Sequence, residues 1–472
     1  MEAGIENAKI EKSFRDKIST VDEEGHRVWI YPKKSKGKLT TYRNIVGYLL
    51  LVIFFIAPFI QIAGEPLILL NVLERKFIFF GMVFWPQDFH IFLLATIIFI
   101  IFIVLFTIIY GRVFCGWICP QTIFMEMVFR KIEYWIEGDW MEQKALDKMP
   151  FTVTKVFKKT IKHVIFFLKS FAISNLFLLY IIGVKSWWNI ISDNPANHIA
   201  GLSAMLVFTG IFYFVYSRFR EQVCTTICPY GRLQGVMLDK NSIMVAYDYL
   251  RGEPRGKMRK NENRKETGKG DCIDCRHCVH VCPTGVDIRN GVQLECINCT
   301  ACIDACNDVM KKTGLPEGLI RFASEENIAN QKPFQWTKRI IAYSIVLILL
   351  MGSLVTLLVT RSDVETSILR TPGILYQEYG KNKYSNLYNV KVVNKTHKDI
   401  AVRFQLENIN GQIIPVGKEP VAKPEAIEEG AFFILLDKKD IRSMKTKVVV
   451  GVYEGKKLIE TVNTTFIGPA TL

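Results

Sequence analysis

The chain has 472 residues, of which 50% are hydrophobic, 12% aromatic and only 22% charged. Its mean hydropathy of +0.18 is high for a soluble protein, and its 32 Phe and 17 Tyr exclude a wholly disordered chain. The apolar residues form blocks of about 20, which excludes a single soluble globule and indicates a multi-pass membrane protein. The net charge of +15 reflects Lys and Arg beside these blocks, as the positive-inside rule describes, rather than nucleic-acid binding.

Five segments are predicted to span the membrane as helices. Each holds about 20 mainly apolar residues, enough at about 1.5 Å per residue to cross a core of about 30 Å. They are residues 44–63, 91–110, 163–184, 199–217 and 339–360. Residues 66–85 are also apolar, but Glu74, Arg75 and Lys76 interrupt them, so this segment is expected to lie at the interface or to re-enter. The polar, lysine-rich first 40 residues exclude a cleavable signal peptide.

The Lys and Arg content of the connections alternates, and this predicts the orientation. It is high in residues 1–43, after the second span and in residues 218–338. Only Arg75 and Lys76 lie between the first two spans, and only Lys185 lies between the third and fourth. We therefore expect a bacterial inner-membrane protein with a cytoplasmic N-terminus and a periplasmic C-terminus.

All 12 cysteines lie between Cys115 and Cys306. This grouping favours metal chemistry on the reducing side of the membrane over a disulfide framework. Eight of them repeat the bacterial ferredoxin run C-x2-C-x2-C-x3-C, with Pro283 after the first copy and Asn307 in place of the second proline. Two zinc ribbons would use the C-x2-C pairs alone and would not require the doubled spacing.

In ferredoxins with this run, three close thiolates bind one cubane and the fourth, offset cysteine binds the other. The predicted ligands of the first [4Fe–4S] cluster are Cys272, Cys275, Cys278 and Cys306. Those of the second cluster are Cys296, Cys299, Cys302 and Cys282. Two adjacent clusters of this kind form a relay for single electrons.

The remaining four cysteines form two CxxxCP motifs, each after a span that enters the cytoplasm. They are Cys115, Cys119, Cys224 and Cys228. If each motif is helical, its cysteines lie about 5–6 Å apart on one face. The four thiolates can then converge on one soft-metal site at the cytoplasmic membrane surface, for Cu(I), Zn or iron–sulfur.

A histidine precedes each of these two spans at nearly the same distance from the motif. His90 precedes the second span and His198 the fourth. This spacing predicts two similarly directed helical hairpins, a parallel repeat about an axis normal to the membrane. Each histidine is interpreted either as an interfacial residue without a ligand role or as a metal or quinol contact at the outer face.

The last 100 or so residues change to period-two alternation, typical of strands. The runs are 387–393, 400–406, 431–436, 447–453 and 457–466, with turn signals at 410–411 and 454–455. They predict an immunoglobulin-type β-sandwich without its disulfide, acting as a docking module or spacer.

The predicted fold is therefore a membrane α-helical bundle of about five spans, with an inserted two-cluster bacterial ferredoxin domain and a C-terminal immunoglobulin-like β-sandwich. The expected divisions are a basic cytoplasmic arm (1–43), a membrane region with two CxxxCP hairpins (44–235), a cytoplasmic ferredoxin domain (236–338), a last span (339–360) and a periplasmic β domain (361–472).

The order of motifs resembles one known family over nearly the whole chain. It runs from Arg27-Val-Trp-Ile-Tyr-Pro in the arm to Cys-Gly-Trp-Ile-Cys-Pro at 115–120, Cys-Pro-Tyr-Gly-Arg-Leu-Gln at 228–234 and on to Asp239, and then to the ferredoxin run, a last span and the β tail. This set resembles the CcoG/FixG/RdxA family of cytochrome c oxidase accessory proteins.

The resemblance implies reduction of Cu(II) to Cu(I) for assembly of a cbb3-type cytochrome oxidase, with copper bound by the four CxxxCP cysteines. It also implies partners among the oxidase assembly machinery, or a copper chaperone or transporter, and an immunoglobulin-like tail.

Two other functions remain open. One is a quinol-oxidising electron conduit of the NapH or NosR type, which shares CxxxCP motifs; the β tail and the Tyr-Pro arm favour the copper function instead. The other is a redox or metal sensor, or an assembly scaffold whose clusters only stabilise the fold. No GxGxxG follows a predicted strand, so the sequence carries no dinucleotide fingerprint and does not identify the electron donor.

Overall fold

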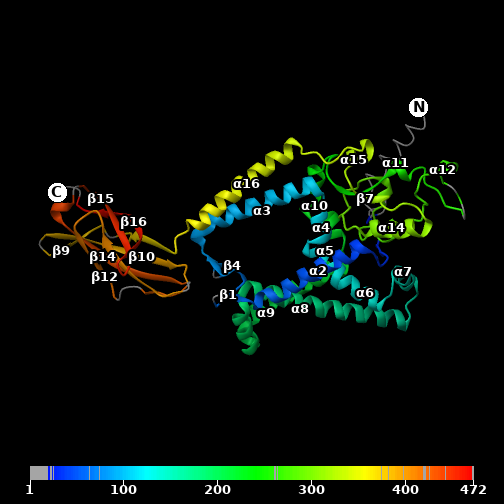
Figure 1. The fold of residues 1–472 in the computed structure, drawn as a ribbon. Coiled ribbons are helices and arrows are strands. Elements are labelled where there is room, and N and C mark those ends of the chain that lie inside the picture. The colour runs from blue at the N-terminus through cyan, green and yellow to red at the C-terminus, as the bar shows by residue number, and fades with distance from the viewer. Residues whose placement is uncertain are drawn as a thin grey trace. The chain divides into compact units, whose positions relative to one another are not determined.

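The computed structural model describes residues 20–469, apart from 22–23, 25, 63, 74, 260–261, 263, 374, 381, 397, 418–420, 425 and 442 and the side chains of Gln87, Arg232 and Lys265. The first 19 residues of the predicted basic arm thus lie outside the described part. The chain divides into two compact units (Figure 1). One comprises Met1–Ile60 and Phe92–Gly352, and the other Gln61–Ile91 and Ser353–Leu472.

Five helical segments of the described chain are long and apolar enough to cross a membrane, so the five predicted spans are confirmed. They are Lys38–Phe59 (α2 with η1), Phe89–Tyr110 (α3), Val153–Ser192 (α8), Pro195–Phe219 (η4, α9 and η5) and Lys338–Val359 (α16). Helix α8 extends beyond both predicted ends, and in its polar N-terminal extension Lys159 and Lys162 pair with the buried Glu137. Gly183 kinks α8 with a φ of 78°.

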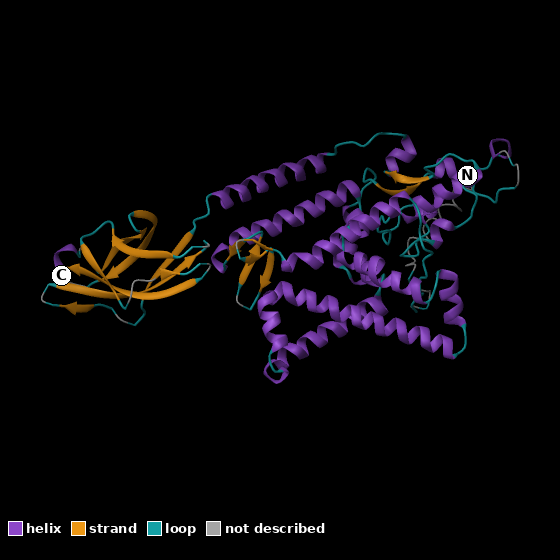
Figure 2. Cartoon of the chain, turned by 60° about the horizontal axis from the view of Figure 1, so that its bottom comes forward, coloured by secondary structure: helices purple, strands orange, loops and turns teal. Residues whose placement is uncertain are grey.

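Aromatic packing joins α2, α8 and α9 in the first unit. Helices α8 and α9 pack against each other as an antiparallel hairpin (Figure 2). A π-helix, η3 (Phe124–Phe129), carries Phe129, which is fully buried. Phe129 stacks on Tyr216 of η5 (Val215–Phe219), with 4.6 Å between ring centroids, and meets Phe166 of α8 edge-on at 4.9 Å. Such ring pairs contribute roughly 0.5–1.5 kcal/mol beyond the area that they bury.

The connection between α2 and α3 forms five short strands: β1 (Gln61–Ile62), β2 (Glu65–Pro66), β3 (Ile68–Asn71), β4 (Lys76–Phe79) and β5 (Met82–Phe84). Strands β3, β4 and β5 make an antiparallel sheet around Ile78 and Val83. Left-handed residues Arg75 and Phe80 turn the chain at each end of β4. The described part of residues 66–85 thus forms no further apolar helix, and its position at the interface or as a re-entrant segment stays a prediction.

The cysteine-rich part of the first unit is built on one small antiparallel pair, β6 (Met244–Tyr247) and β7 (Ile320–Ala323). Its longest helix is α14 (Ala301–Thr313). Shorter helices are α11 (Tyr249–Gly252), α12 (Arg264–Thr267), α13 (His277–His280), η7 (Ile288–Asn290) and α15 (Glu325–Asn330). Val245, Met310 and Ile320 form the centre of its core, which also includes two cysteines.

The C-terminal part of the second unit is a β-sandwich (Figure 2), as predicted. One sheet has the order β12-β14-β10-β8, with β9 also paired to β10, and the other has the order β13-β11-β15-β16. The strands are β8 (Val364–Arg370), β9 (Gln377–Tyr379), β10 (Lys383–Asn394), β11 (Ile400–Leu406), β12 (Gly411–Pro415), β13 (Val421–Ala422), β14 (Ile427–Asp437), β15 (Lys445–Glu454) and β16 (Lys457–Ile467). A short helix, η8 (Lys438–Asp440), follows β14. Tyr388, Phe432, Val450 and Phe466 fill the space between the sheets.

Candidate functional site

Two cavities in the first unit each gather four of the eight ferredoxin-type cysteines. One, with an empty volume of about 350 Å³, is lined by Cys272, Cys275, Cys278 and Cys306. The other, also of about 350 Å³, is lined by Cys282, Cys296, Cys299 and Cys302, and Cys278 borders it. The fold thus brings together the same two sets that the offset ligand rule predicts, because Cys282 and Cys306 each lie beside the other run.

The backbone around both cavities repeats the sequence duplication. Asp274 and Arg276 have φ values of 54° and 57°, and their counterparts Asn298 and Thr300 have φ values of 52° and 66°. Four non-glycine residues in the left-handed region within two short motifs indicate a fold that holds them there against their preference. In each motif the two left-handed residues flank a cysteine, and turns of this kind can direct successive backbone N–H groups into a concavity, as at anion and iron–sulfur sites.

Burial raises the pKa values of five of the thiols in these cavities. The pKa of Cys299 rises to about 11, although the charge of Arg43 opposes the shift. The pKa values of Cys296 and Cys306 rise to about 12. These thiols would therefore be protonated at neutral pH without a bound cation. Iron in a cluster would replace those protons and stabilise the thiolates.

The two CxxxCP motifs share a local geometry in which each second cysteine lies outside the helix that carries the first. Cys115 lies in α4 (Val113–Trp117) and Cys224 in the π-helix η6 (Val223–Ile227). Cys119 and Cys228 have extended backbones, with ψ of 125° and 115°, and each is the N-cap of the next helix, α5 (Pro120–Ile123) and α10 (Pro229–Met237). Proline disfavours helical geometry in the residue before it and is well suited to the first helical position. The predicted shared helix face is therefore wrong.

The four thiols of the motifs lie in one electrostatic neighbourhood. Burial raises the pKa of Cys224 to about 12, and the nearby Cys119 and Cys115 raise it further. Burial also raises the pKa of Cys119, to which Cys228 contributes. In the described part of the chain, no three His, Cys, Asp or Glu side chains converge as they would around a single metal ion. The sulfurs therefore share a region without forming a closed coordination shell.

The first CxxxCP motif packs directly on the loop of the second cluster cavity. A Cβ at Gly116 would lie 2.3 Å from the Ile297 carbonyl oxygen and 3.1 Å from the Cys299 Cα. Trp117 Nε1 donates to the Asn298 carbonyl oxygen at 3.3 Å. Cys115, Ile297 and Cys299 belong to one buried apolar cluster. Only glycine at position 116 permits this approach of the two backbones.

Two buried polar residues support the thiols and were not singled out as site residues from the sequence. Arg112 Nη2 donates to the Cys224 carbonyl oxygen at 3.4 Å, and Nη1 donates to the Leu294 carbonyl oxygen. Its charge lowers the pKa values of three motif thiols against the effect of burial. Gln234, fully buried, has its amide 3.7 Å from Cys115 Sγ. Their sequence positions could have identified them. Arg112 lies three residues before Cys115, and Gln234 is the last residue of the motif at 228–234.

A buried network of charges lies beside this region. Arg220 makes two hydrogen bonds of 2.7 and 2.6 Å to the Glu133 carboxylate. Arg27 of the aromatic arm pairs with Glu221 at 3.1 Å, and its guanidinium lies 4.0 Å from the Trp29 ring centroid. These contacts hold Arg27 and Trp29 beside Glu221, three residues before Cys224.

The structure does not bring the two predicted histidines into a ligand set. His198 is half-buried, and its Nε2 lies 3.0 Å from Asp193 Oδ2. His90 is exposed and belongs to the other compact unit. Neither belongs to a metal-binding group among the described residues. A role for either histidine in binding metal or quinol remains a prediction.

Three family models match parts of the chain. They describe a 4Fe-4S binding domain over residues 92–141, a 4Fe-4S dicluster domain over 219–325, and an IG-like fold at the C-terminus of FixG over 354–469.

Similar proteins include the nitrogen fixation protein FixG of Rhizobium meliloti, 36% identical over 64% of this chain and 58% of its own length. The protein RdxA of Cereibacter sphaeroides is 32% identical over 82% of this chain and 83% of its own length. The ferredoxin-type protein NapH of Escherichia coli is 23% identical over 44% of this chain and 64% of its own length.

Proposed function

The chain belongs to the family of FixG and RdxA, as its motifs predicted, and on that premise we propose that it is a membrane cupric reductase. Electrons pass through two [4Fe–4S] clusters to Cu(II) bound by the CxxxCP thiols, and the Cu(I) formed is used in assembly of a cbb3-type cytochrome oxidase. The chain is a membrane-type iron–sulfur electron-transfer protein of this family. Copper as the acceptor is the proposal.

The proposed cluster ligands are the two cysteine sets that line the two cavities. Support comes from the match between each set and the offset rule of two-cluster ferredoxins. When bound, the two clusters would provide two adjacent redox centres, each of which accepts and releases one electron. The chain contributes buried thiols, left-handed backbone nests and apolar walls that exclude water.

The contact between Gly116 and Cys299 is the observation that carries the proposal. Electron transfer slows steeply with distance, so a relay must meet its acceptor site closely. Here the backbone of a proposed copper motif touches the backbone of a proposed second-cluster ligand, and Cys115 packs in the same apolar cluster. The first-cluster cavity lies farther along the proposed relay, because its lining includes neither Ile297 nor Cys299, the two residues that Gly116 approaches.

The chemistry of the thiols suits copper reduction. Sulfur ligands match soft Cu(I) better than Cu(II), so binding there favours acceptance of one electron by the ion. Arg112 assists, because its buried charge favours the thiolate forms that bind the metal. Each Cu(II) takes one electron from the relay and leaves as Cu(I), and no other bond is made or broken.

A second candidate is quinol oxidation, which the similarity to NapH supports. That similarity covers less than half of this chain. In the copper function electrons leave the relay for Cu(II), whereas in the conduit a quinol gives electrons to the chain. Oxidation of a quinol by the purified protein, with loss of quinol absorbance and no need for copper, would favour the conduit. A sensor or scaffold would turn over neither substrate.

The proposed orientation places the N-terminus and the clusters in the cytoplasm and the β-sandwich in the periplasm. Its support is the alternation of Lys and Arg along the chain. In that orientation Cu(I) leaves on the cytoplasmic side, and we propose a copper chaperone or transporter as its recipient. Reporter fusions after Gly252 and after Gly380 should give opposite signals, cytoplasmic and periplasmic respectively; equal signals would contradict this orientation.

The test of copper reduction is the double variant Cys119→Ser and Cys228→Ser. Serine preserves size but offers a harder ligand, so Cu(I) formation, followed with a chromogenic chelator, should fall to background while cluster absorbance stays unchanged. Thr226→Ser, in the second motif but without loss of a sulfur, is the matched control and should keep the full rate. A double variant that reduces Cu(II) at the full rate would exclude these thiols as the site.

A further inference from the structure

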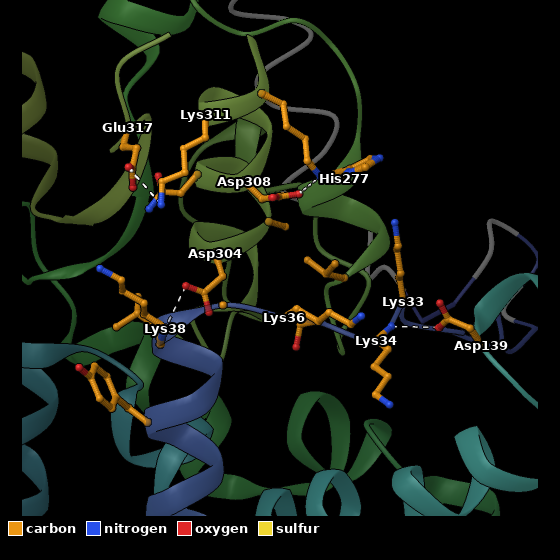
Figure 3. Close-up of a pocket in the computed structure, with 18 of the residues that line it drawn as sticks. Lys33, Lys34, Lys36, Lys38, Asp139, His277, Asp304, Asp308, Lys311 and Glu317 are labelled. Carbon is orange, nitrogen blue, oxygen red and sulfur yellow. Dashed lines mark hydrogen bonds and ion pairs between the residues drawn. The ribbon is translucent and has the colours of Figure 1, made fainter. Parts of the chain in front are cut away.

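A large basic cleft lies in the first unit beside the first-cluster cavity (Figure 3). Its empty volume is about 2050 Å³. One wall is the chain segment that leads into α2, residues 33–39, and the opposite wall includes the outer face of α14. Six lysines line it: Lys33, Lys34, Lys36, Lys38, Lys311 and Lys312.

The lining of the basic cleft holds six lysines and four carboxylates, so its positive charge is in excess, and each carboxylate already has a partner. Asp308 pairs with Lys312 at 2.6 Å, and Glu317 lies 3.4 Å from Lys311 Nζ. Asp139 accepts a hydrogen bond from its neighbour Trp140 as the N-cap of α7 (Trp140–Lys148).

Asp304 holds the lysine-bearing segment in place. Its carboxylate accepts the backbone N–H groups of Leu39 and Thr40 at 3.2 and 2.6 Å, which satisfies the first turn of α2. Gly37 permits this approach, since a Cβ there would lie 2.3 Å from the Asp304 side chain. The segment is therefore fixed by contacts with α14, the helix that carries Cys306.

The lysines of that segment remain available to a partner. Among the described residues, the ammonium groups of Lys33, Lys34, Lys36 and Lys38 form no ion pair. Lys34, Lys36 and Lys38 are exposed, and Figure 3 shows Lys33, Lys34 and Lys36 following one another along the same wall.

The basic cleft meets the surface of the first-cluster cavity. His277 lines both spaces, and the two neighbours of Cys306, Ala305 and Asn307, line the cleft. Cys275, a proposed first-cluster ligand, is exposed. The second-cluster cavity borders the copper motifs instead. The two ends of the relay therefore have different surroundings: thiols at one end and a lysine-rich cleft at the other.

We propose that the basic cleft is the docking site of a small acidic protein that carries single electrons, and that electrons enter the chain at the first cluster. Delivery moves no atom: the carrier loses one electron and the cluster gains it. Transient redox partners bind through small, electrostatically steered interfaces, which suits a positive surface at the entry point. The inference rests on the iron–sulfur relay and is independent of the acceptor being copper.

A reduced dinucleotide fits the basic cleft less well than an acidic protein. Small-molecule sites are lined mainly by apolar and aromatic side chains with few polar groups. Most of the lining here is charged or polar, and Tyr42 and Tyr134 are its aromatic residues. The chain also lacks the glycine-rich dinucleotide fingerprint.

The test compares the full chain, loaded with clusters, with the triple variant Lys34→Gln, Lys36→Gln and Lys38→Gln. Flavodoxin is the probe, because it is an acidic one-electron carrier whose flavin absorbance can be separated from that of the clusters. At low ionic strength the second-order rate of cluster reduction by reduced flavodoxin should fall about tenfold or more in the variant. Binding of oxidised flavodoxin, measured by fluorescence anisotropy, should weaken in parallel, and both effects should shrink as salt is added.

Two controls isolate the docking effect. Reduction by dithionite, which needs no docking surface, should be equal in both proteins and reports intact clusters. The variant Lys445→Gln, Lys456→Gln and Lys457→Gln removes the same charge from exposed positions of the β-sandwich and should leave the rate unchanged. If the first triple variant loses clusters, the single variant Lys36→Gln is used instead. Its rate of cluster reduction by flavodoxin and its affinity for flavodoxin should fall in the same direction by a smaller factor.

Equal flavodoxin rates and affinities in the wild type and the cleft variant would overturn the proposal. Reduction of the clusters by NADH or NADPH that is lost in the cleft variant would also overturn it, in favour of a dinucleotide in the cleft. Loss of copper reduction with normal flavodoxin-driven cluster reduction would contradict the proposed copper function but leave the docking site intact.

Discussion

Gly116→Ala tests whether the contact between the first CxxxCP motif and the second-cluster loop is needed for electron transfer. The added methyl would lie 2.3 Å from the Ile297 carbonyl oxygen, over 1 Å inside ordinary contact. Because both partners are backbone, neither can rotate away, and the two loops must separate by roughly 1 Å. Overpacking of this kind costs about 1–3 kcal/mol of stability. A displacement of 1 Å at a reacting site can cost up to about 10²-fold in rate.

The assay follows cluster absorbance in a stopped-flow instrument as chemically reduced protein is mixed with Cu(II). We expect slower cluster reoxidation in Gly116→Ala, with iron content close to that of the wild type and a lower unfolding temperature. The matched control is Gly201→Ala on α9, where an added Cβ meets no atom within 4 Å. Alanine favours the helix there, so its rate and stability should not fall. An unchanged reoxidation rate in Gly116→Ala would refute the reasoning that this contact carries the relay.

Three further predictions concern other parts of the chain. Arg112→Gln removes the buried charge that lowers the pKa values of the motif thiols, so the pH profile of Cu(II) reduction should shift to higher pH; an unshifted profile would count against this role. Cys275→Ala should lower iron and acid-labile sulfide below the roughly eight irons per chain of two cubanes, and an unchanged content would remove it from the ligand set. In the second unit, burial would raise the pKa of Asp88, but hydrogen bonds from Arg361 and Lys395 lower it below 3.8. Asp88→Asn should therefore destabilise that unit by about 3–5 kcal/mol at neutral pH. Because the native pKa of Asp88 is depressed, the difference should vanish as the pH falls through that native pKa. Hydrogen exchange of β8 and β10 measures it, and a difference that does not depend on pH would contradict this account.

The parts of the fold that depend on local sequence patterns were predictable. Blocks of about 20 apolar residues must be helical in a membrane. Period-two alternation identified β10, β11, β14, β15 and β16 of the sandwich but missed β8, which is as long as β11. The ferredoxin spacing also anticipated which cysteines share a cavity, because chain offset alone decides which run each fourth cysteine can reach. The short strands β9, β12 and β13 escaped detection because runs of two to five residues carry too little periodicity.

The backbone geometry of the two CxxxCP motifs was not predictable from the spacing of their cysteines. A CxxxC pair suggests one helix face, but the proline after each second cysteine ends the helix and turns Cys119 and Cys228 into N-caps. Contacts between distant segments, such as Gly116 with Ile297, leave no local signal in a single sequence. Arg112 was interpreted only as a marker of the cytoplasmic side, since burial of an arginine depends on neighbours from the rest of the fold.

The measurement that tests the central claim most directly is a single-turnover titration. Protein with both clusters reduced, and freed of excess reductant, is mixed under anaerobic conditions with Cu(II), and Cu(I) and oxidised clusters are quantified in the same sample. The account predicts about two Cu(I) per chain, one for each cubane, formed at the same rate as the clusters are oxidised. It also predicts no Cu(I) from the Cys119→Ser, Cys228→Ser double variant, whose clusters stay reduced. Clusters that remain reduced in the wild type while Cu(II) persists, or Cu(I) formed equally by the double variant, would contradict the account.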